Sequence, residues 1–123
     1  AYANDVKVRH LHVDADTLAS HGAVSEPVAR QMATGVRNAL DTDIGVATTG
    51  IAGPGGGSDA KPVGTVWVGY ADAHGTHAAH IRFVNDRHMN KELFATAALD
   101  MIRRQLNRRD GRPIASPRYE STA

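Results

Sequence analysis

Residues 50–64 have the composition best suited to bind a small anion. The segment holds six glycines and two prolines, with Gly-Pro-Gly-Gly-Gly at 53–57. It follows an apolar run that ends at Gly50, and backbone without side chains at a strand end can direct N–H groups toward negative charge. Lys61 precedes a proline and no helix pattern follows the glycines, so neither a P-loop nor a dinucleotide-binding turn is indicated. Composition alone leaves two interpretations open, an anion-binding loop and a plain connection between strands.

Two other sets of side chains are weaker candidates for chemistry. Among the seven histidines, His77 and His80 lie in a predicted strand, where residues three apart point to opposite faces and do not converge on a metal ion. Surface imidazoles are therefore the favoured interpretation of these and of His10, His12 and His74. The arginines between Arg103 and Arg118 lack interleaved aromatic residues, so a solvated basic tail is favoured over a nucleic-acid site.

Bulk properties exclude several functional classes. The 123 residues suit one domain with a real core. The chain has no cysteine, which excludes a disulfide framework, thiol chemistry and thiolate zinc sites. A formal charge of +1 argues against a global attraction to nucleic acid or membranes. No signal peptide and no membrane-length apolar run is evident, so we expect a soluble, cytoplasmic protein without a cofactor or metal.

The segment from about Glu26 to Leu40 is the clearest helix in the sequence. Ser25 is a candidate N-cap, and Pro27 fits the first turn because no intrahelical bond needs its missing N–H. The apolar residues recur at four-residue steps and line one face: Val28, Met32, Val36 and Leu40.

Strands are predicted on both sides of the glycine segment. Residues 44–50 read as a strand buried on both faces. Residues 64–84 read as an antiparallel hairpin joined by a four-residue connection, 72–75, whose glycine suits a positive φ. Trp67 and Tyr70 fall in the first strand of this hairpin, where packing is the favoured role.

A second helix is predicted over residues 86–106, with Asp86 as a candidate cap. From Asn107 onward the chain has no period, and we expect a mobile tail over 107–123. The strands and helices together indicate a mixed α/β layer architecture. Two neighbouring stripes of the second helix are apolar: Leu93, Ala97 and Met101, and Phe94, Ala98 and Ile102.

Five ordered blocks of the chain resemble the CinA C-terminal domain family, the nicotinamide-nucleotide amidohydrolases. The central block is TTGIAGPGGGSDAKPVGTVWVG. It is preceded by two blocks, AYANDVKVRHLHV and HGAVSEPVARQMATGVR. It is followed by RFVNDRHMNKELFATAALDMIRR, which holds the last two blocks, a segment similar to the family's Phe-x-Gly-x-Arg and the closing helix. The resemblance covers residues 1–106 and implies a three-layer α/β/α sandwich on a mixed β-sheet. It also implies hydrolysis of the carboxamide of nicotinamide mononucleotide to nicotinic acid mononucleotide and ammonia.

The resemblance assigns roles to individual residues. Tyr2 and Lys7 match the family's Tyr and Lys, which act with a serine nucleophile. A lysine can take the serine's proton only if its site lowers its pKa, because an ordinary lysine is charged at neutral pH. Arg87 matches an arginine suited to the phosphate. The residues implied to face the nucleotide in the glycine segment are Thr49, Gly50, Ala52 and Gly53.

One family motif is missing from this chain. The family's nucleophile lies in a Glu-Ser-Cys-Thr-Gly-Gly motif upstream of the tyrosine, and none of the five serines here matches it. We therefore expect residues 1–106 to be a partial domain that lacks its first strand and helix. Asn85 also replaces a glycine that the family usually has before Asp86 and Arg87.

Two functional classes stay open. The chain is part of an amidase whose nucleophile lies outside it, or it is a non-catalytic nucleotide-binding or interaction module. In both cases we expect a small nucleotide as the partner, no membrane and no nucleic acid, and we leave a homo-oligomer open.

Overall fold

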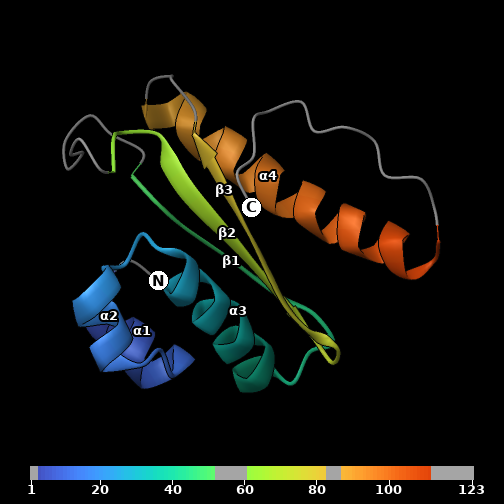
Figure 1. Ribbon diagram of the computed structural model, residues 1–123, viewed down its shortest axis with the longest axis horizontal. Coiled ribbons are helices and arrows are strands. Elements are labelled where there is room, and N and C mark those ends of the chain that lie inside the picture. The colour runs from blue at the N-terminus through green and yellow to red at the C-terminus, as the bar shows by residue number, and fades with distance from the viewer. Residues whose placement is uncertain (1–2, 52–60, 83–86, 112–123) are drawn as a thin grey trace.

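The computed structural model describes residues 3–51, 61–82 and 87–111, without the side chain of Arg87. These residues form a sheet between helical layers (Figure 1). The elements in chain order are α1 (Asn4–Leu11), α2 (Ala15–His21), α3 (Glu26–Leu40), β1 (Gly45–Gly50), β2 (Thr65–Asp72), β3 (Gly75–Arg82) and α4 (Arg87–Arg109).

The sheet has the order β1-β2-β3, with α3 on one face and α4 on the other (Figure 1). Helices α1 and α2 lie beside α3, on the side of α3 away from α4. The α/β class is thus confirmed. Both described strand pairs are antiparallel, so the parallel pair that a mixed sheet requires is not among the strands described here.

Alternate residues of β2 build the two sides of the core. Val66, Val68 and Tyr70 are fully buried and pack toward α4, against Phe94 and Met101. The opposite face of β2 carries Gly69, where an added Cβ would overlap the carbonyl of Ala29, so glycine lets α3 approach the sheet closely. A smaller core cluster joins α3 to the N-terminal helices: Val13, Val28 and Met32, with Leu11, Leu18 and Ala47 packed against it.

The two long helices follow the predicted patterns, except that Leu40, the last residue of the predicted apolar face of α3, is exposed. Helix α3 has the predicted bounds, with proline in its first turn. Ser25 occupies its N-cap position without a side-chain cap bond, because its hydroxyl donates to Gly22 O at 2.8 Å. Helix α4 buries its apolar stripes against the sheet and ends at Arg109, three residues beyond its predicted end at Leu106. Its basic last turn suits the negative end of the helix dipole.

The predicted strands differ from the observed ones in two details. Asp72 pairs with Gly75, so the hairpin turn contains two residues rather than four. An Asp72 carboxylate oxygen accepts the His74 N–H at 2.8 Å, and the glycine has the expected positive φ of 140°. In β1 only Gly45 and Thr49 are fully buried, but both faces of the strand are covered. Val46 packs against the core cluster toward α4 and Ala47 against the cluster with α3, so the expectation of burial on both faces is confirmed in part.

Two short helices were not anticipated from the sequence. Helix α2 begins at a side-chain cap, since Asp14 Oδ1 accepts the N–H groups of Asp16 and Thr17. Helix α1 ends at Leu11 and is followed by the C-cap residue His12, whose φ of 55° is left-handed. In the described ranges, no helix combines the length and the apolar composition that a membrane crossing requires.

Candidate functional site

Lys7 is the chemically most unusual side chain among the described residues. It lies in the middle of α1 and is only 4% exposed, although lysine is among the residues least often buried. Burial disfavours the ammonium form and lowers the pKa of Lys7 below its ordinary value of 10.5. The direction is the one that a general base at moderate pH requires.

Helix α1 is held both at its C-terminal end and against α3. The Lys7 carbonyl accepts the Val13 N–H at 3.0 Å, which fixes the end of the helix. One helix away, Gly35 of α3 has no side chain, and an added Cβ would overlap the Leu11 carbonyl. Helix α1 therefore packs tightly on α3, and the amine of Lys7 keeps a polar neighbour, Asn4 Oδ1, at 3.4 Å.

Thr49 and Gly50 close β1 and lead into the glycine segment. The Thr49 side chain is nearly buried, and its hydroxyl donates to the Ala23 carbonyl at 2.7 Å. A Cβ at Gly50 would lie 2.8–3.0 Å from Thr65 O, the Phe94 ring and Val66, so this glycine is required by packing alone. A contact of either residue with a nucleotide stays a prediction.

The remaining predicted site residues lie wholly or partly outside the described structure. Tyr2, Ala52 and Gly53 fall outside the described residues. Arg87 is the first residue of α4, and its side chain is not described. That end of α4 lies at the same end of the sheet as the last residues of β1 (Figure 1), consistent with the Phe94 ring lying 2.9 Å from the place that a Cβ of Gly50 would occupy.

The histidines behave as the strand geometry predicts. His80 pairs with Trp67, and their rings stack with centroids 4.7 Å apart. His77 pairs with Tyr70, which packs on the opposite face toward α4, so the two histidines do not converge. In the part of the chain that the structure describes, no group of three His, Asp or Glu residues could hold a metal ion.

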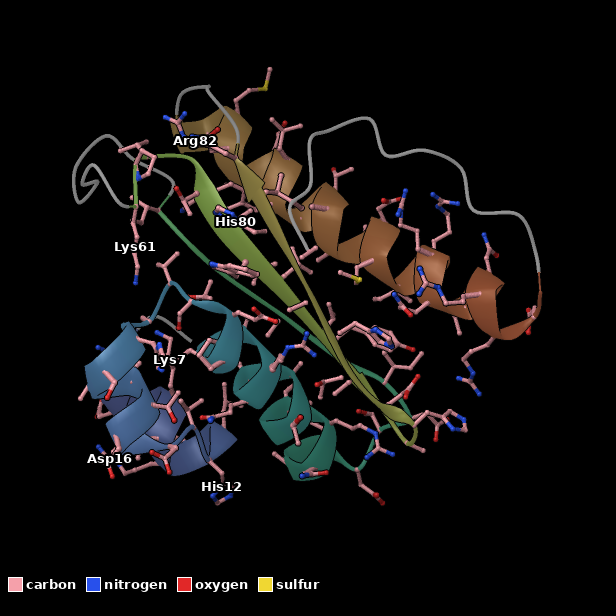
Figure 2. All side chains as sticks on the ribbon, viewed as in Figure 1. Lys7, His12, Asp16, Lys61, His80 and Arg82 are labelled. Atoms are coloured by element: carbon pink, nitrogen blue, oxygen red, sulfur yellow. The ribbon has the colours of Figure 1, made fainter. Side chains whose placement is uncertain are left out.

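The sequence analysis did not predict the long-range contact that Lys61 makes. Lys61 follows the glycine segment and donates to the carbonyl of His21, forty residues earlier in the chain, at 2.6 Å. In Figure 2 its side chain extends from the sheet end toward α2, on the same side of the sheet as Lys7. A lysine after a glycine run gives no local signal of such a partner.

Comparison with known proteins gives a consistent family. The sequence model of the CinA C-terminal domain matches residues 1–106. A CinA-like protein of Salinibacter ruber is 63% identical over 107 residues, which cover 87% of this chain and 26% of that protein. A putative competence-damage inducible protein of Acetivibrio thermocellus is 44% identical and covers 90% of this chain and 27% of its own length.

Solved structures agree with the sequence relatives. The competence/damage inducible protein CihA of Agrobacterium tumefaciens superposes with a TM-score of 0.80 at 38% identity, covering 83% of this chain and 63% of that one. A CinA superfamily protein of Escherichia coli superposes with a TM-score of 0.78 at 35% identity, covering 82% and 59%. The chain thus spans about a quarter of the curated relatives' length. With the family match, the sequence identities and the shared fold in agreement, the chain belongs to the CinA C-terminal domain family.

Proposed function

We propose that this chain is the substrate-binding and general-base part of a nicotinamide mononucleotide amidohydrolase. The observation that carries the proposal is the buried Lys7, whose pKa is lowered by desolvation. A deprotonated amine in a protein interior is a suitable base for activating a hydroxyl nucleophile. Family membership, with the resemblance described above, supplies the substrate class.

In the proposed reaction the neutral amine of Lys7 takes the proton of a serine hydroxyl as its oxygen attacks the carboxamide carbon. The new C–O bond gives a tetrahedral intermediate. The C–N bond then breaks, and the Lys7 ammonium returns its proton to the leaving group, which departs as ammonia. Water attacks the resulting ester with Lys7 again as base, which releases the carboxylate and restores the serine. Tyr2 relays or orients a proton in these steps.

Substrate binding is assigned to residues outside α1. We expect Thr49, Gly50, Ala52 and Gly53 to place backbone against the nucleotide, and Arg87 to pair with its phosphate. The phosphate contact does not depend on the serine. Arg87→Ala should therefore weaken nucleotide binding even in a chain that performs no hydrolysis.

A second function is favoured by one specific observation. Residues 1–123 contain no Glu-Ser-Cys-Thr-Gly-Gly motif, so the nucleophile has to come from elsewhere. If none is supplied, the chain is a nucleotide-binding module without the chemistry. The two functions differ in one measurable product, which is ammonia.

The deciding experiment measures ammonia released from nicotinamide mononucleotide. We would compare the 123-residue chain with the protein encoded by its whole reading frame, and test Lys7→Arg in the latter. The amidase proposal expects ammonia from the whole protein, none from the chain, and loss of turnover in Lys7→Arg, because arginine holds its proton too tightly to act as a base. The matched control is Lys91→Arg, since Lys91 is exposed on α4. No ammonia from the whole protein would favour the binding module, and an active Lys7→Arg variant would remove Lys7 as the base.

A further inference from the structure

The turn between α2 and α3 is held by one of its own side chains, Ser25, and by two side chains from later in the chain, Thr49 and Lys61. It presents three consecutive carbonyl oxygens, and each accepts a hydrogen bond from a different side chain. The three bonds are Lys61 Nζ to His21 O at 2.6 Å, Ser25 Oγ to Gly22 O at 2.8 Å, and Thr49 Oγ1 to Ala23 O at 2.7 Å.

The contact made by Lys61 is favourable for two reasons. The carbonyl of His21 lies in the last turn of α2, where carbonyls lack intrahelical partners and the helix dipole attracts a cation. The next residue, Gly22, has a φ of 77°, and a Cβ built there would lie 2.9 Å from Lys61 Nζ. Glycine thus both suits the backbone and leaves room for the ammonium.

Lys61 and Thr49 lie on the two flanks of the β1–β2 connection. The flanks are also joined to each other, since Ile51 N donates to Thr65 O at 2.8 Å and Gly64 N donates to Ile51 O. Both flanks are therefore hydrogen-bonded to the same turn, Lys61 to the carbonyl of His21 and Thr49 to the carbonyl of Ala23. A displacement of the turn would move both flanks together.

We infer that Lys61 is a positioning residue, whose bond to the His21 carbonyl holds the start of β2 against the α2–α3 turn and thereby sets nucleotide affinity at this end of the sheet. Lys61 acts through the backbone and is not assigned a contact with substrate. The attachment of β2 to the turn follows from the contacts alone, whereas the effect on nucleotide affinity rests on the proposed function.

The test uses the 123-residue chain with two substitutions at position 61. Lys61→Met keeps the apolar stem and removes the donor, whereas Lys61→Arg keeps a charged donor. Lys91→Met is the matched control, because it removes the same charge from an exposed site. Hydrogen exchange of the Ile51, Gly64 and Thr65 amides reports attachment of the flanks, and calorimetry with nicotinamide mononucleotide reports affinity.

In Lys61→Met we expect these amides to exchange about tenfold faster and the nucleotide to bind about tenfold more weakly, the size of one charge-assisted hydrogen bond. In Lys61→Arg, the exchange rates and the nucleotide affinity should both stay close to those of the unsubstituted chain. Lys91→Met should change neither quantity. In the whole protein Lys61→Met should raise KM and leave kcat unchanged. If Lys61→Met does not fold, Lys61→Gln takes its place, because it removes the charge and keeps a polar side chain.

The outcomes separate the two claims. Unchanged exchange in Lys61→Met would overturn the role of Lys61 at the turn. Faster exchange with unchanged affinity would overturn its effect on the nucleotide. Faster exchange in a chain whose unsubstituted form binds no nicotinamide mononucleotide would support the attachment and count against the proposed function.

Discussion

Asn4→Asp should make Lys7 harder to deprotonate. Asn4 is exposed, and its Oδ1 lies 3.4 Å from Lys7 Nζ. Aspartate has nearly the same shape as asparagine and adds a negative charge at that point. It is also well tolerated in the first turn of a helix, where negative charge is favourable, so the fold should be kept. The added charge stabilises the ammonium form and raises the pKa of Lys7.

The size of the effect follows from Coulomb's law at this distance. Two unit charges 3.4 Å apart attract by about 5 kcal/mol at an effective dielectric constant near 20 and by about 1.2 kcal/mol in bulk water. Because position 4 is exposed, the lower end applies, and we expect about 1–2 kcal/mol. At a given pH below the pKa, the fraction of neutral Lys7 should therefore fall about tenfold or somewhat more.

The assay is an NMR titration of the lysine side chains in the 123-residue chain, which needs no catalytic activity. The titration midpoint of Lys7 should move to higher pH in Asn4→Asp. Asn4→Ala separates charge from the loss of the amide and should move the midpoint much less. The exposed Lys91 serves as an internal control in every sample. In the whole protein, the acid limb of the pH–rate profile should shift in the same direction.

An unchanged Lys7 midpoint in a folded Asn4→Asp chain would refute this reasoning. It would mean that the carboxylate and the amine are not neighbours in solution. A shift of Lys7 together with an equal shift of Lys91 would indicate a general change in net charge instead.

Three further substitutions test the fold around the site. Lys7→Met should raise the free energy of unfolding at pH 7 by about 0.5–2 kcal/mol, and in the whole protein it should abolish ammonia release. The stabilisation is expected because the buried Lys7 ammonium opposes folding at any pH below the lowered pKa of the folded state. The difference in unfolding free energy should shrink as pH rises from that pKa to 10.5 and be absent above 10.5, and a difference that persists there would contradict this explanation. Gly35→Ala should lower the free energy of unfolding, measured in urea, by about 1–3 kcal/mol, because the added Cβ meets the Leu11 carbonyl and this outweighs alanine's better helix propensity. Asn38→Ala, at an exposed position of the same helix, is the control. Equal effects of the two substitutions would refute the close packing of α1 on α3. Tyr70→Phe should cost about 1–2 kcal/mol in the same assay, since the hydroxyl of this fully buried residue donates to Asp72 Oδ2 at 3.0 Å, and an unchanged urea midpoint would count against that bond.

The sequence by itself determined the elements whose signals are local. The four-residue apolar steps between Val28 and Leu40 predicted α3 with the right bounds, and the apolar stripes of α4 identified its buried face. The hairpin was correctly located, although its turn was assigned two residues too many. Helices α1 and α2 were missed because they are short, and short helices are stable mainly through packing that no local pattern records.

The site was only partly accessible from the sequence. Resemblance to the family selected Lys7, but the low exposure of its side chain and the lowering of its pKa depend on the tertiary packing that buries it. The partner of Thr49 lies 26 residues away, and the partner of Lys61 lies 40 residues away. Hydrophobic periodicity is a property of neighbouring residues and can be read along the chain. Desolvation and long-range hydrogen bonds depend on which distant segments meet, so only the tertiary structure decided them.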